Sequence, residues 1–275
     1  MTARVREAVF LLGILLLSGC AKTTAPSAQG KQATAPAPKR EKTRLIAFVG
    51  AASKPPTTEA KEIFEKANPS IVVDITFGGS GTLLQQMTLE EIGDIYMPGS
   101  DDYMDKAEAK KAVLPETRKI VVYLIPMICV RHGNPKNIHS LKDLARPGIT
   151  VGLAEAGAVC LGDASDSILR KAGLEKQVKK NVITYAKSCD QTQQLVQLGE
   201  VDAVIGWDAF KAWSPNEIDV VPIPELRPPV YNIPAAVTVY SKHPEAAETF
   251  ISFLTSEQGK AIFSKHGYRV TMPKV

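Results

Sequence analysis

The feature that most constrains the fold is a turn of small residues between an apolar run and a helix-forming segment. Residues 71–77 have the β-branched composition of a buried strand, and the turn after them is Gly78-Gly79-Ser80-Gly81. The first backbone N–H groups of a helix have no intrahelical partner, and the helix dipole adds partial positive charge there. The turn therefore predicts a strand, a helix start and a place where an anion can bind.

Other glycine-containing motifs of similar sequence fit this turn less well. A nucleophile elbow requires glycine at position 82, where the chain has Thr82. A dinucleotide-binding fingerprint requires its third glycine where the chain has Leu84, and a P-loop requires a lysine that does not follow. A capped turn that binds nothing stays open as the structural alternative.

A second turn of the same construction lies near the start of the globular region. The run 43–49 is apolar enough for a short buried strand, and Ser53 stands just before Pro55 and Pro56, which suit the first turn of a helix. Parallel strands that each lead into a helix end at one edge of a sheet, where open α/β folds bind ligands. Ser53 and Ser80 are therefore expected at the same edge.

The N-terminal segment is typical of a processing signal. Two arginines precede the apolar run 9–17, which is too short to span a bilayer and leads to Leu17-Ser18-Gly19-Cys20. This tetrapeptide resembles the bacterial lipobox, in which the cysteine is lipidated. We predict a lipoprotein signal peptide over residues 1–19, and then lipidated Cys20 with a flexible tether over residues 20–43, which has almost no large apolar side chain. A cleaved soluble secretory peptide is the alternative.

The composition excludes several classes of function. The 275 residues are 44% hydrophobic and 23% charged, which are the proportions of a soluble globular protein. The net charge of +4 is small, and no basic cluster is interleaved with aromatic residues, so we predict no nucleic-acid partner. The four histidines have no close ligand spacing, so we predict no metal site.

Strands and helices alternate along the rest of the chain, and two extended segments interrupt the alternation. The apolar run 120–130 contains Pro126 and is too long for one typical strand, so we predict that it crosses between two sheets. A second apolar segment near residue 233 brings the chain back. The prediction is an α/β fold of two lobes with a ligand cleft between them. The first lobe comprises residues 44–122 and 234–275, and the second comprises residues 123–233.

Four motifs are spread over residues 44–275. They are Phe48-Val49-Gly50-Ala51-Ala52-Ser53, Phe77-Gly78-Gly79-Ser80-Gly81-Thr82-Leu83, Gly199-Glu200-Val201-Asp202-Ala203-Val204-Ile205-Gly206-Trp207 and the closing segment Phe250–Gly267. Together they resemble the substrate-binding proteins of molybdate-type ABC transporters, which belong to the two-lobed periplasmic binding proteins of type II. The resemblance implies a binding protein that has neither enzymatic activity nor a cofactor.

The resemblance also implies which residues bind the ligand. In the family, a tetrahedral oxyanion is held by two serines of the first lobe, and by two backbone N–H groups and a tyrosine hydroxyl of the second. The serines correspond to Ser53 and Ser80. The backbone donors correspond to Leu161, within Cys160-Leu161-Gly162, and to Cys189. The tyrosine position holds Trp207, which donates one N–H from a bulkier ring.

Cys160 and Cys189 are far apart in the sequence, but the resemblance places both beside the ligand. Three interpretations stay open. The two cysteines form a disulfide in the second lobe, which an oxidising compartment would permit. Alternatively, they are free thiols that favour a softer ligand, such as a thiolated oxyanion or trivalent arsenic. In the third interpretation they are small buried residues.

The function that the resemblance implies is the capture of an oxyanion outside the cytoplasm. A monomer, lipid-anchored to a bacterial membrane, binds molybdate or tungstate and delivers it to an ABC permease and its ATPase. The alternative is a lipoprotein that senses another anion, for example an arsenic or sulfur oxyanion, and signals to a membrane partner. A hydrolase is the weakest interpretation, because no histidine near Ser53 or Ser80 in the sequence suits a catalytic triad.

Overall fold

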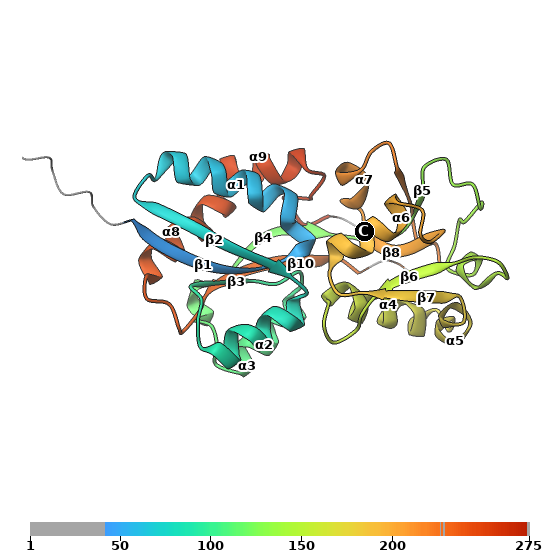
Figure 1. The fold of residues 1–275 in the computed structure, drawn as a ribbon, viewed down its shortest axis with the longest axis horizontal. Helices are drawn as coiled ribbons and strands as arrows, with labels where there is room; N and C mark the ends of the chain where they lie inside the picture. Colours follow the sequence, from blue (N-terminus) through green and yellow to red (C-terminus); the bar gives the residue numbers. More distant parts are fainter. Residues whose placement is uncertain (1–41, 226, 228, 274–275) are drawn as a thin grey trace, which may run out of the picture. The chain divides into compact units, whose positions relative to one another are not determined.

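The computed structural model describes residues 42–273, apart from residues 226 and 228. The predicted signal peptide, Cys20 and nearly all of the predicted tether lie outside the described residues. Within the described part of the chain, no helix is both long enough and apolar enough to cross a membrane. The described residues form two five-stranded sheets, and helices cover both (Figure 1).

The first sheet has the strand order β2-β1-β3-β10-β4. Strand β1 is parallel to β2 and β3, whereas β10 is antiparallel to β3 and β4. Because β1 and β2 run in register until Gly50 lies opposite Gly78, both strands end at the same edge of the sheet. The strands span Thr43–Gly50 (β1), Ile71–Gly78 (β2), Ile95–Met97 (β3), Lys119–Leu124 (β4) and Tyr231–Val237 (β10).

The second sheet has the strand order β7-β6-β8-β5-β9. Strand β6 is parallel to β7 and β8, and β5 lies antiparallel between β8 and β9. Its strands span Pro126–Arg131 (β5), Val151–Ala154 (β6), Val182–Ala186 (β7), Ala203–Trp207 (β8) and Ile218–Val221 (β9). As in the first sheet, parallel strands that each lead into a helix occupy neighbouring positions, so their helix starts lie at one edge.

The chain passes from the first sheet to the second between Leu124, which ends β4, and Pro126, which begins β5. The apolar run that was predicted to cross between sheets is therefore two strands, one in each sheet. Proline lacks a backbone N–H and fixes φ, so it suits the end of a strand better than its middle. The chain returns between Val221 and Tyr231. The predicted two-lobed α/β fold is confirmed, and the predicted lobe boundaries stay a prediction.

Helices lie on both faces of each sheet (Figure 1). In the first lobe, α1, α8 and α9 pack together on one face, and α2 and α3 lie on the other. In the second lobe, α4 and α5 lie on the face opposite to α6 and α7. The helices span Lys54–Ala67 (α1), Ser80–Glu90 (α2), Asp101–Ala109 (α3), Cys160–Lys171 (α4), Glu175–Lys179 (α5), Cys189–Gln197 (α6), Phe210–Trp213 (α7), Pro244–Thr255 (α8) and Glu257–Lys265 (α9); the 3-10 helices are η1 (Ala51–Ser53), η2 (Pro115–Thr117) and η3 (Asp143–Ala145).

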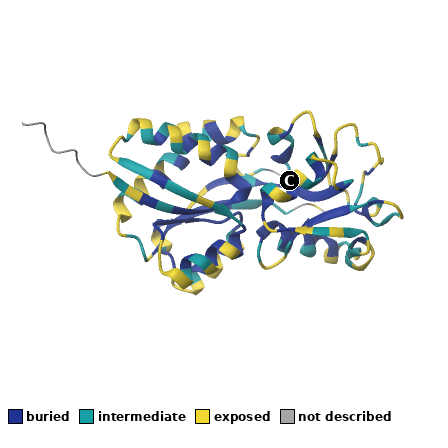
Figure 2. Cartoon of the chain, viewed as in Figure 1, coloured by how far each residue is buried: buried dark blue, intermediate teal, exposed yellow. Residues whose placement is uncertain are grey.

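The buried residues concentrate in the sheets and on the helix faces that cover them (Figure 2). Phe64 of α1 packs against Phe250 and Phe253 of α8, with ring centroids 4.9 Å and 5.5 Å away. Complete burial of a phenylalanine contributes about 1.5–3 kcal/mol relative to exposure. This packing fixes α1 on the sheet, and with it the position of Ser53 just before the helix.

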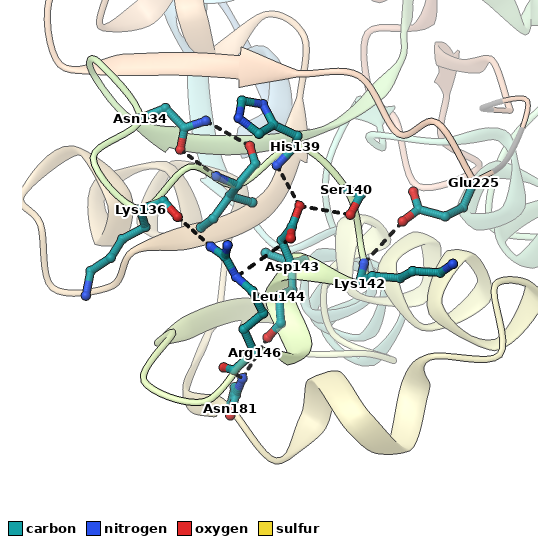
Figure 3. A network of polar contacts seen from close by, with 11 residues as sticks. Asn134, Lys136, His139, Ser140, Lys142, Asp143, Leu144, Arg146, Asn181 and Glu225 are labelled. Atoms are coloured by element: carbon teal, nitrogen blue, oxygen red, sulfur yellow. Dashed lines mark hydrogen bonds and ion pairs between the residues drawn. The ribbon is translucent and has the colours of Figure 1, made fainter.

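The loop between β5 and β6 is fastened by polar contacts (Figure 3). The Asp143 carboxylate accepts hydrogen bonds from the Ser140 hydroxyl and from the backbone N–H of His139, both at 2.9 Å. Asn181, which stands just before β7, donates to the carbonyl oxygen of Leu144 at 2.8 Å. These contacts tie the loop to the edge of the sheet formed by β6 and β7, from which the chain continues toward α4 and α6.

Candidate ligand-binding site

Helix starts from both lobes converge on one point, and each carries a buried hydroxyl or thiol. Ser53 immediately precedes α1, and the first residues of α2, α4 and α6 are Ser80, Cys160 and Cys189. These four residues are only 0–3% exposed. Because the first N–H groups of each helix carry partial positive charge, this arrangement favours a negatively charged or strongly polar ligand.

The first turn of α2 presses against the two loops that lead into α4 and α6. The N–H of Gly81 donates to the carbonyl oxygen of Ala158 at 2.9 Å. A Cβ atom at Gly79 would lie 2.5 Å from that oxygen and 2.8 Å from the carbonyl oxygen of Lys187. Both distances are shorter than any normal contact, so this approach requires glycine. The loops before α4 and α6 therefore meet at the start of α2.

Ser80 lies at the centre of this contact. Its hydroxyl oxygen accepts a hydrogen bond from the N–H of Gly99 at 3.0 Å, and its carbonyl oxygen accepts one from the Tyr96 hydroxyl at 2.8 Å. A Cβ atom at Gly99 would lie 2.6 Å from the sulfur of Cys160 and 3.6 Å from the hydroxyl oxygen of Ser80. Ser80 and Cys160 therefore lie close together, one from each lobe.

Ser53 and Cys189 form the neighbouring part of the site. Lys54, the residue after Ser53, forms an ion pair with Asp190, the residue after Cys189, at 2.8 Å. The 3-10 helix that ends with Ser53 also packs against α6. The Ser53 hydroxyl donates to the carbonyl oxygen of Gly50 at 3.2 Å, a long hydrogen bond that a ligand oxygen could replace.

The thiols of Cys160 and Cys189 are in contact with each other. The Cys189 thiol donates a hydrogen bond toward the Cys160 sulfur, and this is the main cause that lowers the pKa of Cys160. Burial opposes that effect, while the Ser80 hydroxyl and the N–H of Leu161 reinforce it. As the proton donor in a buried pair, Cys189 has its pKa raised well above the ordinary value, first by that hydrogen bond and then by burial. Of the two thiols, Cys160 is therefore the one that loses its proton first.

In this structure, all three cysteines of the described region, Cys129, Cys160 and Cys189, are free thiols. The contact between Cys160 and Cys189 is thus a thiol pair here and not a disulfide. The contact brings Cys160 and Cys189 together, and a disulfide between them stays a prediction. Cys129 lies on β5, where its thiol is 3.8 Å from the carbonyl oxygen of Trp207, and burial raises its pKa.

Trp207 closes the site from the second lobe. It is the last residue of β8, it is completely buried, and its ring packs edge-on to Tyr231 with centroids 5.3 Å apart. Its Nε1–H points toward the Cys189 sulfur and lowers the pKa of that thiol. The same N–H has no nitrogen or oxygen acceptor among the described residues. A buried unpaired donor costs about 1–3 kcal/mol, so a ligand oxygen that accepted this N–H would be stabilised.

The charged side chains around the site have partners of their own. The Asp163 carboxylate accepts a hydrogen bond from the Tyr103 hydroxyl at 2.7 Å, and Lys106 lies 3.7 Å from the same carboxylate. Lys54 and Asp190 form the ion pair described above. The positive potential at the centre of the site therefore comes chiefly from helix starts, and the donors that face it are uncharged.

A cavity of about 180 Å³ lies elsewhere, at the opposite end of the first sheet. Its lining includes Arg44, Asp94 and Lys242. Asp94 is already engaged, because it accepts hydrogen bonds from the N–H of Ile46 at 2.8 Å and from the Ser241 hydroxyl at 2.6 Å. The helix starts that carry the buried hydroxyls and thiols do not line this cavity, so we do not assign the ligand to it.

The structure brings together the residues that were predicted from the sequence to form the site. Ser80, Cys160, Cys189 and Trp207 face one another, Ser53 lies beside Cys189, and the N–H of Leu161 points at the Cys160 sulfur. Their roles as ligand contacts stay a prediction. Among the described residues, no group of three histidine, cysteine or acidic side chains could hold a metal ion.

Three residues that shape the site were not predicted from the sequence. Gly99 brings the chain close to Cys160, and a Pro-Gly turn after β3 was the only signal for it. Tyr231 packs on Trp207, and burial raises the pKa of its hydroxyl to about 12. Tyr268 donates a hydrogen bond to the carbonyl oxygen of Ala52, beside Ser53. Neither tyrosine belongs to a local motif that could have identified it.

Known proteins resemble most of this chain in sequence. Residues 45–269 match the model of a family described as bacterial extracellular solute-binding protein. The molybdate-binding protein ModA of Mycobacterium tuberculosis is 26% identical over 224 residues, which cover 82% of this chain and 84% of ModA. YvgL of Bacillus subtilis, named as an ABC transporter substrate-binding lipoprotein, is 23% identical over 94% of this chain and 95% of its own.

Solved structures share the fold. The periplasmic molybdate-binding protein of Azotobacter vinelandii superposes with a TM-score of 0.70, over 84% of this chain and 100% of its own, at 17% sequence identity. At that identity the likeness establishes the two-lobed architecture alone. It agrees with the two sheets and two crossings described above.

Proposed function

The chain belongs to the bacterial extracellular solute-binding proteins, and we propose that it captures a tetrahedral oxyanion between its lobes for an ABC transporter. The observation that carries the proposal is the convergence of Ser53, Ser80, Cys160 and Cys189, each buried at a helix start. Molybdate and tungstate are the anions that the sequence motifs favour. We include the residues Leu161 and Trp207 in the site as N–H donors.

Uncharged donors suit this task for a physical reason. An oxyanion held between the lobes loses its hydration, and hydrogen bonds to a charged acceptor in a site without water are stronger than those between neutral groups. Helix starts provide positive potential without a mobile cation, so the anion is bound by geometry as much as by charge. Binding of this kind selects by size and number of oxygens, because every donor must meet an acceptor.

The proposed partners follow from the predicted N-terminus. A lipid on Cys20 and a tether over residues 20–43 would hold the binding lobes beside a membrane, on its extracytoplasmic side. There the protein would act as a monomer that delivers the anion to an ABC permease, driven by its ATPase. The name of YvgL as a lipoprotein supports this arrangement.

A ligand panel tests the proposal. The purified full-length protein is heated with and without molybdate, tungstate, sulfate and phosphate, with chloride as the matched control, and its unfolding temperature is measured. Ligand at 100 times its Kd stabilises the folded state by about 2.7 kcal/mol, so a true ligand shifts the transition by several degrees. We expect molybdate or tungstate to give the largest shift. If none of the four oxyanions shifts the transition beyond chloride, the proposal is wrong.

A further inference from the structure

The thiol pair is the part of the site that tetrahedral-oxyanion binding does not require. Cys160 and Cys189 are 3% and 2% exposed, they start two helices whose preceding loops both meet the start of α2 at Gly79, and the Cys189 thiol is a hydrogen-bond partner of Cys160. Cys129, in the same lobe, is equally buried and faces a carbonyl oxygen at 3.8 Å. Two sulfurs in contact can both bond to a single atom, so the pair is a ready bidentate site for a ligand that forms bonds to sulfur.

The surroundings of the pair narrow the class of ligand. A metal ion that needs three or more protein ligands does not fit, because the described residues offer no third histidine, cysteine or acidic ligand beside the pair. Any cation would also meet partial positive charge from the starts of α2, α4 and α6. A neutral or anionic species does not meet this repulsion. An oxyacid whose central atom exchanges oxygen for sulfur, and is satisfied by two thiols, fits these surroundings.

We propose that Cys160 and Cys189 bind trivalent arsenic, taken up as arsenous acid, in the same interlobe site. The inference rests on the proposed function, since it uses the same cleft and names a metalloid oxyacid as its ligand. In the binding step two arsenic–sulfur bonds form and two arsenic–oxygen bonds break. Each departing hydroxyl leaves with one thiol proton as water, so two water molecules are released. Arsenic stays trivalent, and no oxidant or reductant is needed.

The remaining groups of the site complement the bound species. One hydroxyl stays on arsenic, and the buried Nε1–H of Trp207, which lacks a nitrogen or oxygen acceptor, points toward the Cys189 sulfur next to it. Ser80, on the other side of the pair, accepts the N–H of Gly99 and directs its own hydroxyl hydrogen toward the Cys160 sulfur, so it lies within reach of a species bound to that sulfur. The lowered pKa of Cys160, caused first by the Cys189 thiol, favours the thiolate that begins the exchange.

The experiment titrates the reduced full-length protein with sodium arsenite and follows tryptophan fluorescence and the unfolding temperature. Trp207 lies against Cys189, so arsenic on the pair should change its emission. We expect saturation at one arsenic per chain. Cys160→Ser and Cys189→Ser should each weaken binding roughly tenfold or more, because one thiol remains and the advantage of a two-point attachment is lost. Cys129→Ser is the matched control and should bind arsenite as the wild type does.

A second measurement keeps the proposal testable if a serine variant fails to fold. Arsenic K-edge X-ray absorption on the wild-type complex should give two sulfur neighbours and one oxygen neighbour. Three oxygen neighbours, an absence of binding, or equal binding by Cys160→Ser and wild type would each overturn the proposal. If the reduced protein binds molybdate or tungstate but not arsenite, only the inference about arsenic is wrong. If it binds arsenite through both thiols but binds no tetrahedral oxyanion, the inference about arsenic stands and the function proposed above is wrong.

Discussion

Ser53 and Ser80 are both buried hydroxyls at helix starts, but they are held differently. Ser80 accepts the N–H of Gly99 at 3.0 Å, and its hydroxyl hydrogen points toward the Cys160 sulfur, a weak acceptor that a ligand oxygen can replace. Ser53 donates to the carbonyl oxygen of Gly50 at 3.2 Å and must give up that hydrogen bond to reach a ligand. We therefore expect Ser80 to contribute more to ligand affinity than Ser53.

Replacing Ser80 with alanine tests this difference. A hydrogen bond to a charged group is worth about 1.5–3 kcal/mol, so Ser80→Ala should weaken binding of the preferred anion by roughly ten- to a hundredfold. Ser53→Ala should weaken it less. Thr82→Ala, which removes an exposed hydroxyl from the same helix turn, is the control and should leave the affinity unchanged. Calorimetric titration measures all three, and wild-type affinity in Ser80→Ala would remove Ser80 from the site.

Single residues differ in how far the sequence reveals them. Ser53 and Ser80 could be predicted because each follows a strand and precedes a helix, a pattern contained within a few residues. The hydrogen bond from Tyr268 to Ala52 joins positions 216 residues apart, and no local pattern encodes it. The thiol state of Cys160 and Cys189 depends on their contact and surroundings, so the sequence left a disulfide, free thiols and simple burial open.

Helix α2 is the element that contacts the opposite lobe most closely at the site, because its start touches the loops that precede α4 and α6. Gly79 permits this approach: a Cβ there would meet the carbonyl oxygens of Ala158 and Lys187 at 2.5 Å and 2.8 Å. These are backbone atoms and cannot swing aside as a side chain can. The seating of α2 against the loops before α4 and α6 thus requires that Gly79 has no side chain. The same holds for Gly81, where a Cβ would lie 2.2 Å from the carbonyl oxygen of Gly157.

Gly79→Ala should therefore separate the lobes at the site. We expect the anion affinity to fall at least tenfold, or about 1.4 kcal/mol, because the donors of the two lobes no longer reach one ligand together. Gly78→Ala is the neighbouring control, since the atoms nearest to its Cβ would belong to the Leu83 side chain, at 3.2 Å and beyond. Calorimetry on both variants makes the comparison. Equal affinity in Gly79→Ala and Gly78→Ala would show that the close approach does not matter for binding.

Elements could be predicted where the signal is local. The run 120–130 was too long for one strand, and Pro126 marked the point where the chain changes sheets. The pairing of β10 with β3 and β4 could not be predicted, because strand order depends on contacts between distant segments. That pairing carries Tyr231 to the site, which explains why this residue was missed.

For the whole molecule, the lobes are held together by contacts around the rim of the site. The Gly81 N–H donates to the Ala158 carbonyl oxygen at 2.9 Å, and the Tyr103 hydroxyl donates to Asp163 at 2.7 Å. Lys54 and Asp190 form an ion pair at 2.8 Å between the starts of α1 and α6. A ligand that is buried by these contacts must enter when they open, so opening and closing of the lobes would govern binding and release.

The ion pair between Lys54 and Asp190 makes closure of the lobes depend on pH. Burial raises the pKa of Asp190, but hydrogen bonds from Lys54 and Ser188 outweigh it, and the net pKa lies below the ordinary value. A carboxyl with a lowered pKa stabilises the closed form above its ordinary pKa of about 3.9, and that stabilisation is lost as the pH falls through the lowered value. Closure and anion affinity should therefore be steady at neutral pH and decline in strong acid.

Asp190→Asn removes the ion pair and its titration. For a partly exposed pair we expect a loss of about 0.2–1 kcal/mol in anion affinity at neutral pH, and a flatter decline in acid than in the wild type. Glu257→Gln, which removes an exposed pair with Lys260 within one helix, is the control. The measurement is the anion affinity of the wild type, Asp190→Asn and Glu257→Gln from neutral to acid pH. Identical profiles for Asp190→Asn and wild type would show that the pair plays no part in closure.

We infer that an oxyanion binds where the starts of α1, α2, α4 and α6 converge. Anomalous scattering from tungsten, in crystals of the protein grown with tungstate, locates the anion directly. We predict one peak whose oxygens lie about 2.7–3.2 Å from the hydroxyl of Ser80 and the N–H of Leu161, with Ser53 and Trp207 also facing it. A peak at another place, or tungstate that leaves these donors without contact, would contradict the claim.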